Sequence, residues 1–311
     1  MHGHDDEHRP TSVYWVLLVG LITFSLSPIL VRLAGEAPGL TIAVWRTLIA
    51  AAVLMPFALI RARGEIMALD RRDLLLIAAA GILLGLHFVG WIESLYHTTV
   101  ASASVLVTTS PIFLALLGYV FLGERISKPV GAAIGLAVVG ASLIGLGDLS
   151  ASTGTRVAGE PLLGNALALA ASLVFSVYLL VGRVVRQKTS WLAYVFPLYA
   201  VAGMTALVIA LLLETPLLGF RPGFYVLCAA MALGPQLLGH GSFNYAVRYI
   251  AAAMLGLLSL VEPVGASLLA YLLFGERPGV LAASGMVVVL VAISFAILQG
   301  RRTSASVPVT D

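Results

Sequence analysis

The sequence predicts an all-α integral membrane protein with ten transmembrane helices, arranged as two inverted five-helix repeats. Of its 311 residues, 60% are hydrophobic and 11% are charged, whereas soluble domains carry about 45–50% apolar and about 25% charged residues. Long runs contain no Asp, Glu, Lys or Arg, and a motif of the first half recurs in the second. A net charge of +3 and a single cysteine, Cys228, favour neither a nucleic-acid partner nor an internal disulfide.

The first five helices are predicted from apolar runs of about 20 residues, the length that crosses roughly 30 Å of hydrocarbon. Only the second run must tolerate an internal charge, Arg46. A short turn around His97 separates the third helix from the fourth. We expect these helices near residues 13–34, 39–60, 73–95, 99–122 and 128–147, which together form repeat 1, residues 13–147.

The second five helices follow the same pattern, with Glu262 as the one charge inside a run. We expect them near residues 160–182, 190–213, 224–247, 250–273 and 278–299, which form repeat 2, residues 160–299. A polar linker, 148–159, joins the repeats, and tails 1–12 and 300–311 flank them. The stretch from His2 to His8 has two interpretations, a divalent-metal site or a solvated tail.

Basic residues predict the orientation, because cytoplasmic loops of membrane proteins collect Lys and Arg. With a cytoplasmic N-terminus, the outside loops carry only Arg156, Arg221 and Arg277. The inside segments carry thirteen, namely Arg9, Arg61, Arg63, Arg71, Arg72, Arg125, Lys128, Arg183, Arg186, Lys188, Arg248, Arg301 and Arg302. We therefore expect a multi-pass protein of the cell inner membrane with both termini in the cytoplasm.

An internal repeat relates the two halves. A shift of 152 places Pro111, Tyr119 and the triplet 123–125 on Pro263, Tyr271 and the triplet 275–277. A shift of 151 places Phe24, Ser25 and Arg32 on Phe175, Ser176 and Arg183. Five helices are an odd number, so the second copy enters the membrane from the opposite side. Such inverted repeats are typical of secondary transporters, whose substrate site lies near the midplane between the repeats.

Each half resembles an EamA domain of the drug/metabolite transporter (DMT) superfamily. In the second half the resemblance rests on the run 239–250, on Glu262-Pro263 and on the triplet 275–277. In the first half it rests on Trp45-Arg46 and on the stretch 110–125. The resemblance implies ten helices and the export of small metabolites, often amino acids or toxic analogues. The first half departs from the second because Ser110 stands in the place of Glu262.

Glu262 is the first candidate site residue. A charge inside the bilayer costs about 2.5–3.5 kcal/mol on insertion scales, so a charged residue there is a functional candidate by default. Pro263 follows it directly and lacks the backbone donor of a regular helix, so the helix can bend there. Two interpretations remain open. The carboxyl group binds a proton or a substrate amine, or it only forms a hydrogen bond to a neighbouring helix.

Two polar stripes provide the next candidates. The eighth helix carries Gln236, His240 and Asn244 at intervals of four, and the third carries His87 and Trp91 on one face. Inverted equivalence pairs these helices, so we expect the stripes to line one water-filled cavity. The two histidines are proton carriers or interhelical hydrogen-bonding groups, and Trp91 contacts substrate or packs in the core.

Arg32, Arg46 and Glu93 are expected near the outer side, where they form either an outer gate, a site for a substrate carboxylate, or a structural ion pair between Arg46 and Glu93. The two Gly-Glu-Arg triplets, 123–125 and 275–277, are expected as turns that begin with a left-handed glycine cap. There is no Walker A motif, no zinc-protease motif and no cysteine pair, so we expect no cofactor, no metal and no enzymatic activity.

These observations predict a secondary transporter that exports small metabolites by alternating access, with amino acids as the leading class. Its partners are a small-molecule substrate, membrane lipid and, for coupling, protons. A facilitator or importer of small metabolites is an alternative within transport. An intramembrane lipid-handling or scaffold protein is the alternative from another class, and it would carry its polar residues on a partner-facing surface.

Overall fold

The computed structural model describes residues 10–305 apart from residues 36, 99, 125, 152–159 and 275–278. This described part is helical throughout and contains no strand, as the sequence predicts. The helices of the first half are α1 (Ser12–Leu33), α2 (Gly39–Arg61), α3 (Arg63–Met67), α4 (Arg71–His97), α5 (Val100–Val107), α6 (Ser110–Leu122) and α7 (Lys128–Ala151). Those of the second half are α8 (Pro161–Arg186), α9 (Trp191–Leu212), α10 (Pro222–Met231), the π-helix η1 (Ala232–His240), α11 (Gly241–Ala246), α12 (Ala252–Ser259), α13 (Val261–Phe274) and α14 (Val280–Ala305).

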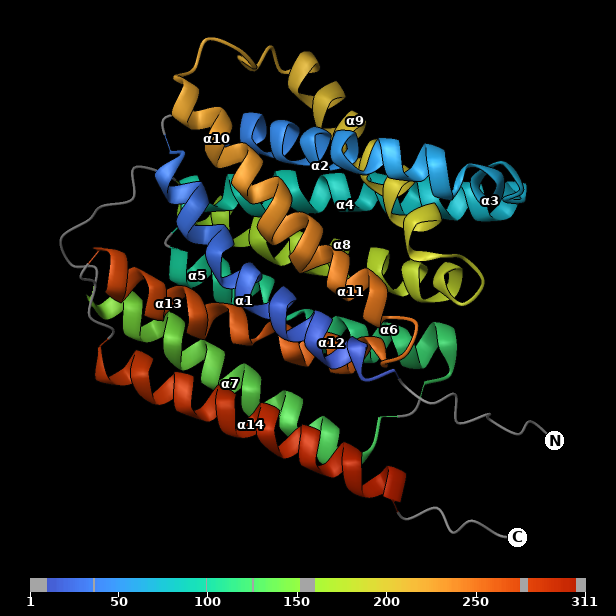
Figure 1. The fold of residues 1–311 in the computed structure, drawn as a ribbon. Coiled ribbons are helices and arrows are strands. Elements are labelled where there is room, and N and C mark those ends of the chain that lie inside the picture. The colour runs from blue at the N-terminus through green and yellow to red at the C-terminus, as the bar shows by residue number, and fades with distance from the viewer. Residues whose placement is uncertain are drawn as a thin grey trace, which may run out of the picture.

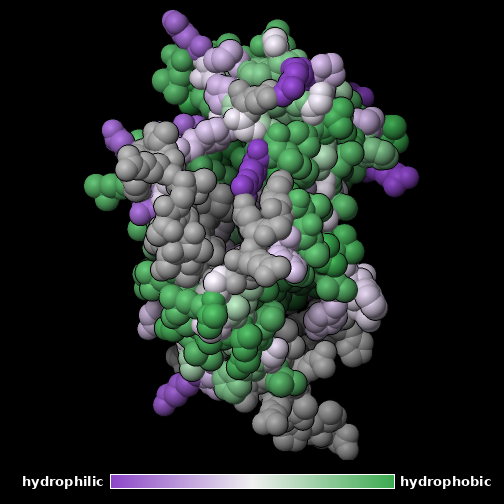
Figure 2. Space-filling view, turned by 90° about the vertical axis from the view of Figure 1, so that its left-hand side faces the viewer, coloured by the Kyte–Doolittle hydropathy of each residue, from purple (hydrophilic) through white to green (hydrophobic). Residues whose placement is uncertain are grey.

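Seven helical segments of the described residues are long and apolar enough to cross a membrane. They are α1, α2, α4, α8, α9, the continuous run from α10 through α11, and the α12–α13 pair. The other three predicted spans fall on α5–α6, α7 and α14, whose described apolar stretches are shorter. Figure 2 shows hydrophobic side chains over much of one face of the molecule. The protein is therefore a multi-pass helical membrane protein.

Two predicted boundaries differ from the structure. The first four residues of the expected linker, 148–151, continue α7, and residues 300–305 of the expected C-terminal tail continue α14. Neither stretch contains proline, the residue that most strongly ends a helix. The polar residues in these stretches were therefore not enough to end α7 or α14. The remainder of the expected linker and the stretch His2 to His8 lie outside the described residues.

The fourth and ninth predicted helices are interrupted at corresponding points. Residues 108 and 109 separate α5 from α6, and Leu260 separates α12 from α13. A proline follows each break, Pro111 and Pro263, and each lacks the N–H group that would continue the helical hydrogen bonding. The helix is thus interrupted beside Glu262, where the sequence predicts that it can bend, and a second interruption lies at the matching site of the first half.

The helices pack in pairs that join the two halves of the chain. α4 lies along α8 and α9, α2 along α9, and α1 along η1 and α13, while α7 and α14 run side by side at one edge of the bundle (Figure 1). Close approach is possible because α4 presents Gly85 to α9: a Cβ there would lie 2.7 Å from the carbonyl oxygen of Ala202. The core is consequently formed between the halves.

The bundle has two distinct ends. At the α3 end, Lys188 pairs with Asp73 at 2.7 Å, and α1 begins and α14 ends there (Figure 1). At the opposite end, which we call the linker end, the Trp45 indole Nε1 donates to the carbonyl of Leu217 at 2.8 Å. The cavity described next lies between these two ends.

Candidate functional site

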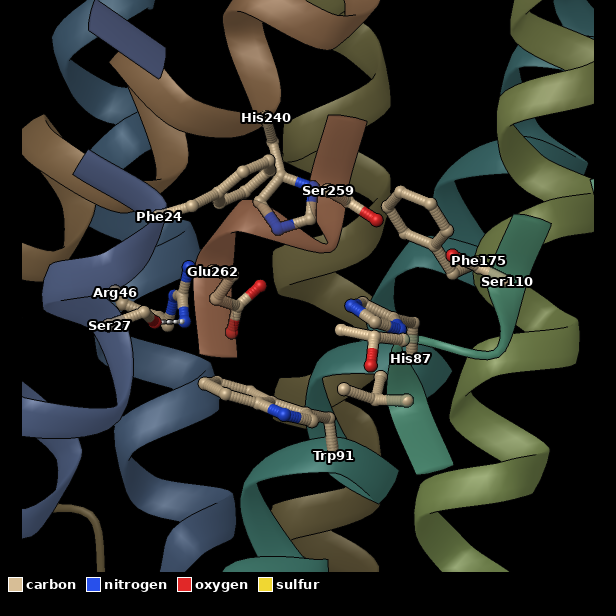
Figure 3. Close-up of a pocket in the computed structure, with 12 residues that line it drawn as sticks. Phe24, Ser27, Arg46, His87, Trp91, Ser110, Phe175, His240, Ser259 and Glu262 are labelled. Carbon is tan, nitrogen blue, oxygen red and sulfur yellow. Dashed lines mark hydrogen bonds between the residues drawn. The ribbon is translucent and has the colours of Figure 1, made fainter. Parts of the chain in front are cut away.

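A cavity lies where α1, α2, α4, α8, η1 and the two interrupted helices meet. Its volume of about 460 Å³ includes space that is open to solvent. Figure 3 shows side chains from both halves of the chain pointing into it. Its lining consists of Phe24, Ser27, Arg46, His87, Trp91, Val107, Thr108, Ser110, Phe175, His240, Ser259 and Glu262. Polar and aromatic groups therefore face a common space inside an apolar bundle.

Arg46 enters the cavity from α2 and is 1% exposed. Its Nε donates to Oε1 of Gln236 at 3.0 Å and its Nη1 to Oγ of Ser27 at 3.4 Å. The guanidinium carbon lies 4.4 Å from the ring centroid of Phe88, within the range of a cation–π contact. Its Nη2 has no hydrogen-bond partner among the residues that the structure describes. Arg46 is thus a buried cation held by neutral groups.

Glu262 lies in the first turn of α13, directly after the break that separates α12 from α13. Figure 3 shows its carboxyl group pointing into the space between Arg46, Trp91 and His87. No ion pair joins Glu262 to any cation among the described residues. The residue at the matching break of the first half, Ser110, lines the same cavity.

The two predicted histidines meet in this cavity. The centroids of the His87 and His240 rings are 5.8 Å apart. His87 Nδ1 donates to the carbonyl of Ala171 at 2.9 Å, and His240 Nδ1 shares a 3.4 Å hydrogen bond with the hydroxyl of Tyr178. Both imidazoles therefore use Nδ1 for a hydrogen bond to α8.

The polar stripe of the eighth predicted helix is divided. Its middle adopts a π-helix, η1, which contains Pro235; single π-turns are frequent at functional sites. Of the stripe, His240 lines the cavity and Gln236 reaches it through Arg46, whereas Asn244 does not line it. The backbone carbonyl of Asn244 accepts a hydrogen bond from Arg186 Nε at 2.9 Å, so this residue belongs to the packing toward the α3 end.

The expected ion pair between Arg46 and Glu93 is not formed. Arg46 bonds to Gln236 and Ser27, while Glu93 pairs with His97 on its own helix at 3.4 Å. Arg32 lies in the last turn of α1, outside the cavity lining. The packing of the helices explains the difference. The π-helix η1 brings the neutral amide of Gln236 to Arg46, whereas Glu93 pairs within α4, near the end of that helix.

Sequence reasoning missed much of the lining, including Phe24, Ser27, Thr108, Phe175 and Ser259. Phe24 and Phe175 are related by the shift of 151, and Val107 and Ser259 by a shift of 152. A search for repeat-related positions near the two prolines would have found several of them. Ser27 offers no such signal, because short hydroxyl side chains are common in apolar helices.

The first Gly-Glu-Arg triplet is more than a turn. Gly123 caps α6 in the left-handed conformation expected of it, with φ of 66°. Glu124, however, forms an ion pair with Arg183 at the end of α8. Arg183 Nη1 also donates to the carbonyls of Val247 and Ile250 at 2.9 and 3.0 Å. This contact joins the two halves at the α3 end, and the second triplet lies largely outside the described residues.

Long apolar helices that enclose charged and polar side chains define a multi-pass membrane protein with an internal polar cavity, the architecture of a small-molecule transporter. Within the described residues, no three His, Cys, Asp or Glu side chains gather where they would hold a metal ion. The chain belongs to the EamA-like transporter family, which matches residues 11–146 and again residues 162–298.

Several known proteins are similar to the chain. The pseudopaline exporter CntI of Pseudomonas aeruginosa is 32% identical over 123 residues, which span 39% of this chain and 42% of that protein. A probable terminal-alkyne amino-acid exporter of Streptantibioticus cattleyicolor is 30% identical over 76% of this chain and 78% of its own. A crystal structure with 20% sequence identity matches with a TM-score of 0.76 over 95% of this chain and 99% of the other.

Proposed function

We propose that this transporter exports small metabolites, with amino acids or their toxic analogues as the leading class, by alternating access. The observation that carries the proposal is a polar cavity lined from both halves of the chain. A substrate bound there would contact both repeats at once. A rocking motion of one repeat against the other would then open the cavity to each side in turn.

The repeat relationship of the lining supports this mechanism. Four pairs of lining residues are separated by nearly constant intervals: Phe24 and Phe175 by 151, Val107 and Ser259 by 152, Ser110 and Glu262 by 152, and His87 and His240 by 153. In an inverted repeat, such pairs would surround the axis that relates the two halves. A site on that axis is equally accessible to both orientations of an inverted repeat, as alternating access requires.

The same proposal includes ten membrane crossings, two inverted five-helix repeats and cytoplasmic termini in the cell inner membrane. The packing is consistent with it, because α1 begins and α14 ends at the same end of the bundle (Figure 1). An even number of crossings produces that arrangement. The excess of basic residues in the segments assigned to this end favours the cytoplasm there.

Relatives support export as the direction of transport. The two relatives reported above are exporters by name, one of pseudopaline and one, a probable exporter, of a terminal-alkyne amino acid. Glu262 is the proposed coupling residue, because its carboxyl group faces the cavity without an ion-pair partner in the described part of the chain. His87 and His240 are the further groups that can carry a proton.

The alternatives make different demands on the cavity. A facilitator or importer would use the same cavity without coupling or in the reverse direction. A lipid-handling or scaffold protein would place its polar residues at a partner-facing surface, but Arg46, Gln236, His87 and His240 are all buried. This burial favours transport over the alternative from another class.

A growth screen followed by a flux assay tests the proposal. Cells that overexpress the protein are challenged with amino acids and toxic analogues, and the protective hits are then measured as substrates in proteoliposomes. We expect resistance to some of them and flux that depends on the protein. Equal growth of expressing and empty-vector cells, together with no flux above protein-free liposomes, would refute export of this class.

A further inference from the structure

Arg46 is a buried cation that forms no ion pair among the described residues. It is 1% exposed and lines the cavity, yet no carboxylate lies within ion-pair distance of it among the described residues. Its partners Gln236 and Ser27 are neutral, and its Nη2 has no hydrogen-bond partner in the described part of the chain. A buried charge of this kind is costly unless an opposite charge and full hydrogen bonding compensate it.

Gln236 fixes the orientation of that cation. Its Oε1 must be the atom that accepts from Arg46 Nε, because an amide nitrogen cannot accept a hydrogen bond. Gln236 is 0% exposed, and its backbone carbonyl accepts from the hydroxyl of Tyr199 at 2.9 Å. Among the described residues, neither Nε2 of Gln236 nor Nη2 of Arg46, both buried donors, has a hydrogen-bond partner. Two adjacent side chains thus leave donors unused beside the cavity.

The charges of the cavity break its repeat symmetry. The shifts that relate the two halves, 151 to 153, place Arg46 on residues 197–199, none of which is charged, and they place Glu262 on Ser110. The matching helix of the second half therefore folds without the cation, and the matching helix of the first half folds with Ser110 in place of the carboxylate. Figure 3 shows Arg46 and Glu262 near each other beside the same cavity. Because neither charge has an ion-pair partner among the described residues, a ligand that carries both charges would compensate them.

We propose that Arg46 binds the carboxylate of a zwitterionic substrate through Nη2, that Gln236 is the positioning residue that holds the guanidinium, and that Glu262 faces the substrate ammonium group. This assignment deepens the proposed function and rests on it. The planar guanidinium offers a fork of donors that suits a carboxylate. The substrate carboxylate supplies the missing negative charge, and the aromatic lining contacts the remainder of the molecule.

The test introduces a carboxylate into the protein beside Arg46, so that the substrate carboxylate is no longer needed to compensate the cation. In Gln236→Glu, the new carboxylate lies beside Arg46 Nε and compensates the cation without a ligand. Gln187→Glu is the matched control, since it adds the same charge at an exposed position whose side chain bonds only to the carbonyl of Arg248. Thermal shifts of the purified proteins are measured with each of the twenty common L-amino acids, and for every binder with its decarboxylated amine.

We expect at least one amino acid to stabilise the parent and Gln187→Glu alike. Gln236→Glu should bind it roughly 30-fold or more weakly, as for loss of a buried charge pair, and should bind the decarboxylated amine within about threefold of the parent. Arg46→Gln is the second variant, and it should show the same split between amino acid and amine. Because a merely structural change would weaken both probes equally, the split reports on carboxylate recognition.

Two results would overturn the inference. One is a Gln236→Glu or Arg46→Gln protein that binds the amino acid with the affinity of the parent. The other is a parent that no amino acid stabilises. If that parent still transports a solute from the growth screen, the carboxylate site is wrong and the transporter assignment stands. If it transports none of them, the proposed function fails as well.

Discussion

His87 and His240, one from each half of the chain, lie ring against ring with 5.8 Å between their centroids. Phe88 packs edge-on against His240 at 4.8 Å, and Phe175 lies 5.9 Å from the same imidazole. The two histidines are 153 residues apart, close to the shifts that relate the repeats. A motion of one half of the chain against the other would change the contact between these two rings. The contact could therefore link proton binding to the transport motion.

Topology is the first prediction. Reporter fusions at Ser152 and after Arg302 should report opposite compartments, with the fusion after Arg302 in the cytoplasm. The reason is the thirteen-to-three distribution of basic residues between the two sets of loops. Alkaline phosphatase and green fluorescent protein fusions measure this directly. The same compartment for both sites would contradict ten crossings.

The sequence predicted the positions of most helices because each apolar run is long and its ends are polar. It did not predict where helices are interrupted in the first half or become π-helical in the second, since these depend on contacts with other helices. Pro263 signalled one interruption through the charge beside it, whereas Pro111 has only Ser110 as a neighbour. Helix α7 also continues four residues into the predicted linker, which shows that local polarity alone does not decide where a helix ends.

The candidate site was predicted in part. Glu262, chosen for its charge inside an apolar run, lines the cavity together with His87, Trp91 and His240 from the two stripes. Arg46 was expected beside Glu93, because depth along a helix can be estimated from sequence but the rotation of one helix against another cannot. The partner that the structure provides, Gln236, comes from 190 positions away in the chain.

Packing between the halves is the second prediction. Gly85→Ala should lower the free energy of unfolding by about 1–3 kcal/mol, the usual cost of overpacking, because its Cβ would lie 2.7 Å from the Ala202 carbonyl oxygen and 2.9 Å from Thr205 Cβ. Gly135→Ala is the control, since a Cβ there meets nothing within 4 Å. Thermal unfolding in detergent compares the two. Equal midpoints for both variants would show that α4 and α9 are not closely packed.

The ion pair between Glu124 and Arg183 is the third prediction. Glu124→Gln should lower the free energy of unfolding by about 1–2 kcal/mol, between the values typical of exposed and of buried pairs. It should also increase labelling of cavity cysteines from the α3 end, because this contact joins the halves there. Glu160→Gln, which removes an exposed carboxylate beside the start of α8, should change neither. If Glu124→Gln changes neither the stability nor the labelling, the ion pair of Glu124 does not hold the two halves together at the α3 end.

Coupling through Glu262 is the fourth prediction. Glu262→Gln should reduce proteoliposome flux roughly tenfold or more, which corresponds to about 1.4 kcal/mol of barrier, and should remove its dependence on an imposed pH gradient. Gln keeps the shape of the side chain but cannot titrate. Ser110→Ala, at the repeat-related position, should keep the pH dependence. A Gln variant with the rate and pH dependence of the parent would move the coupling role to His87 or His240, or make the protein an uncoupled facilitator.

The central claim, that the cavity is the substrate pathway, is tested most directly by the reactivity of a cysteine at Trp91. In a Cys228→Ser background, which removes the one native cysteine, Trp91→Cys should react with a small, water-soluble thiol reagent, and a transported substrate should slow the reaction. Leu84→Cys, on the same helix but in the packed core with 0% exposure, should stay unreactive. A Trp91→Cys protein as inert as Leu84→Cys, or one whose labelling rate no transported substrate changes, would contradict the account.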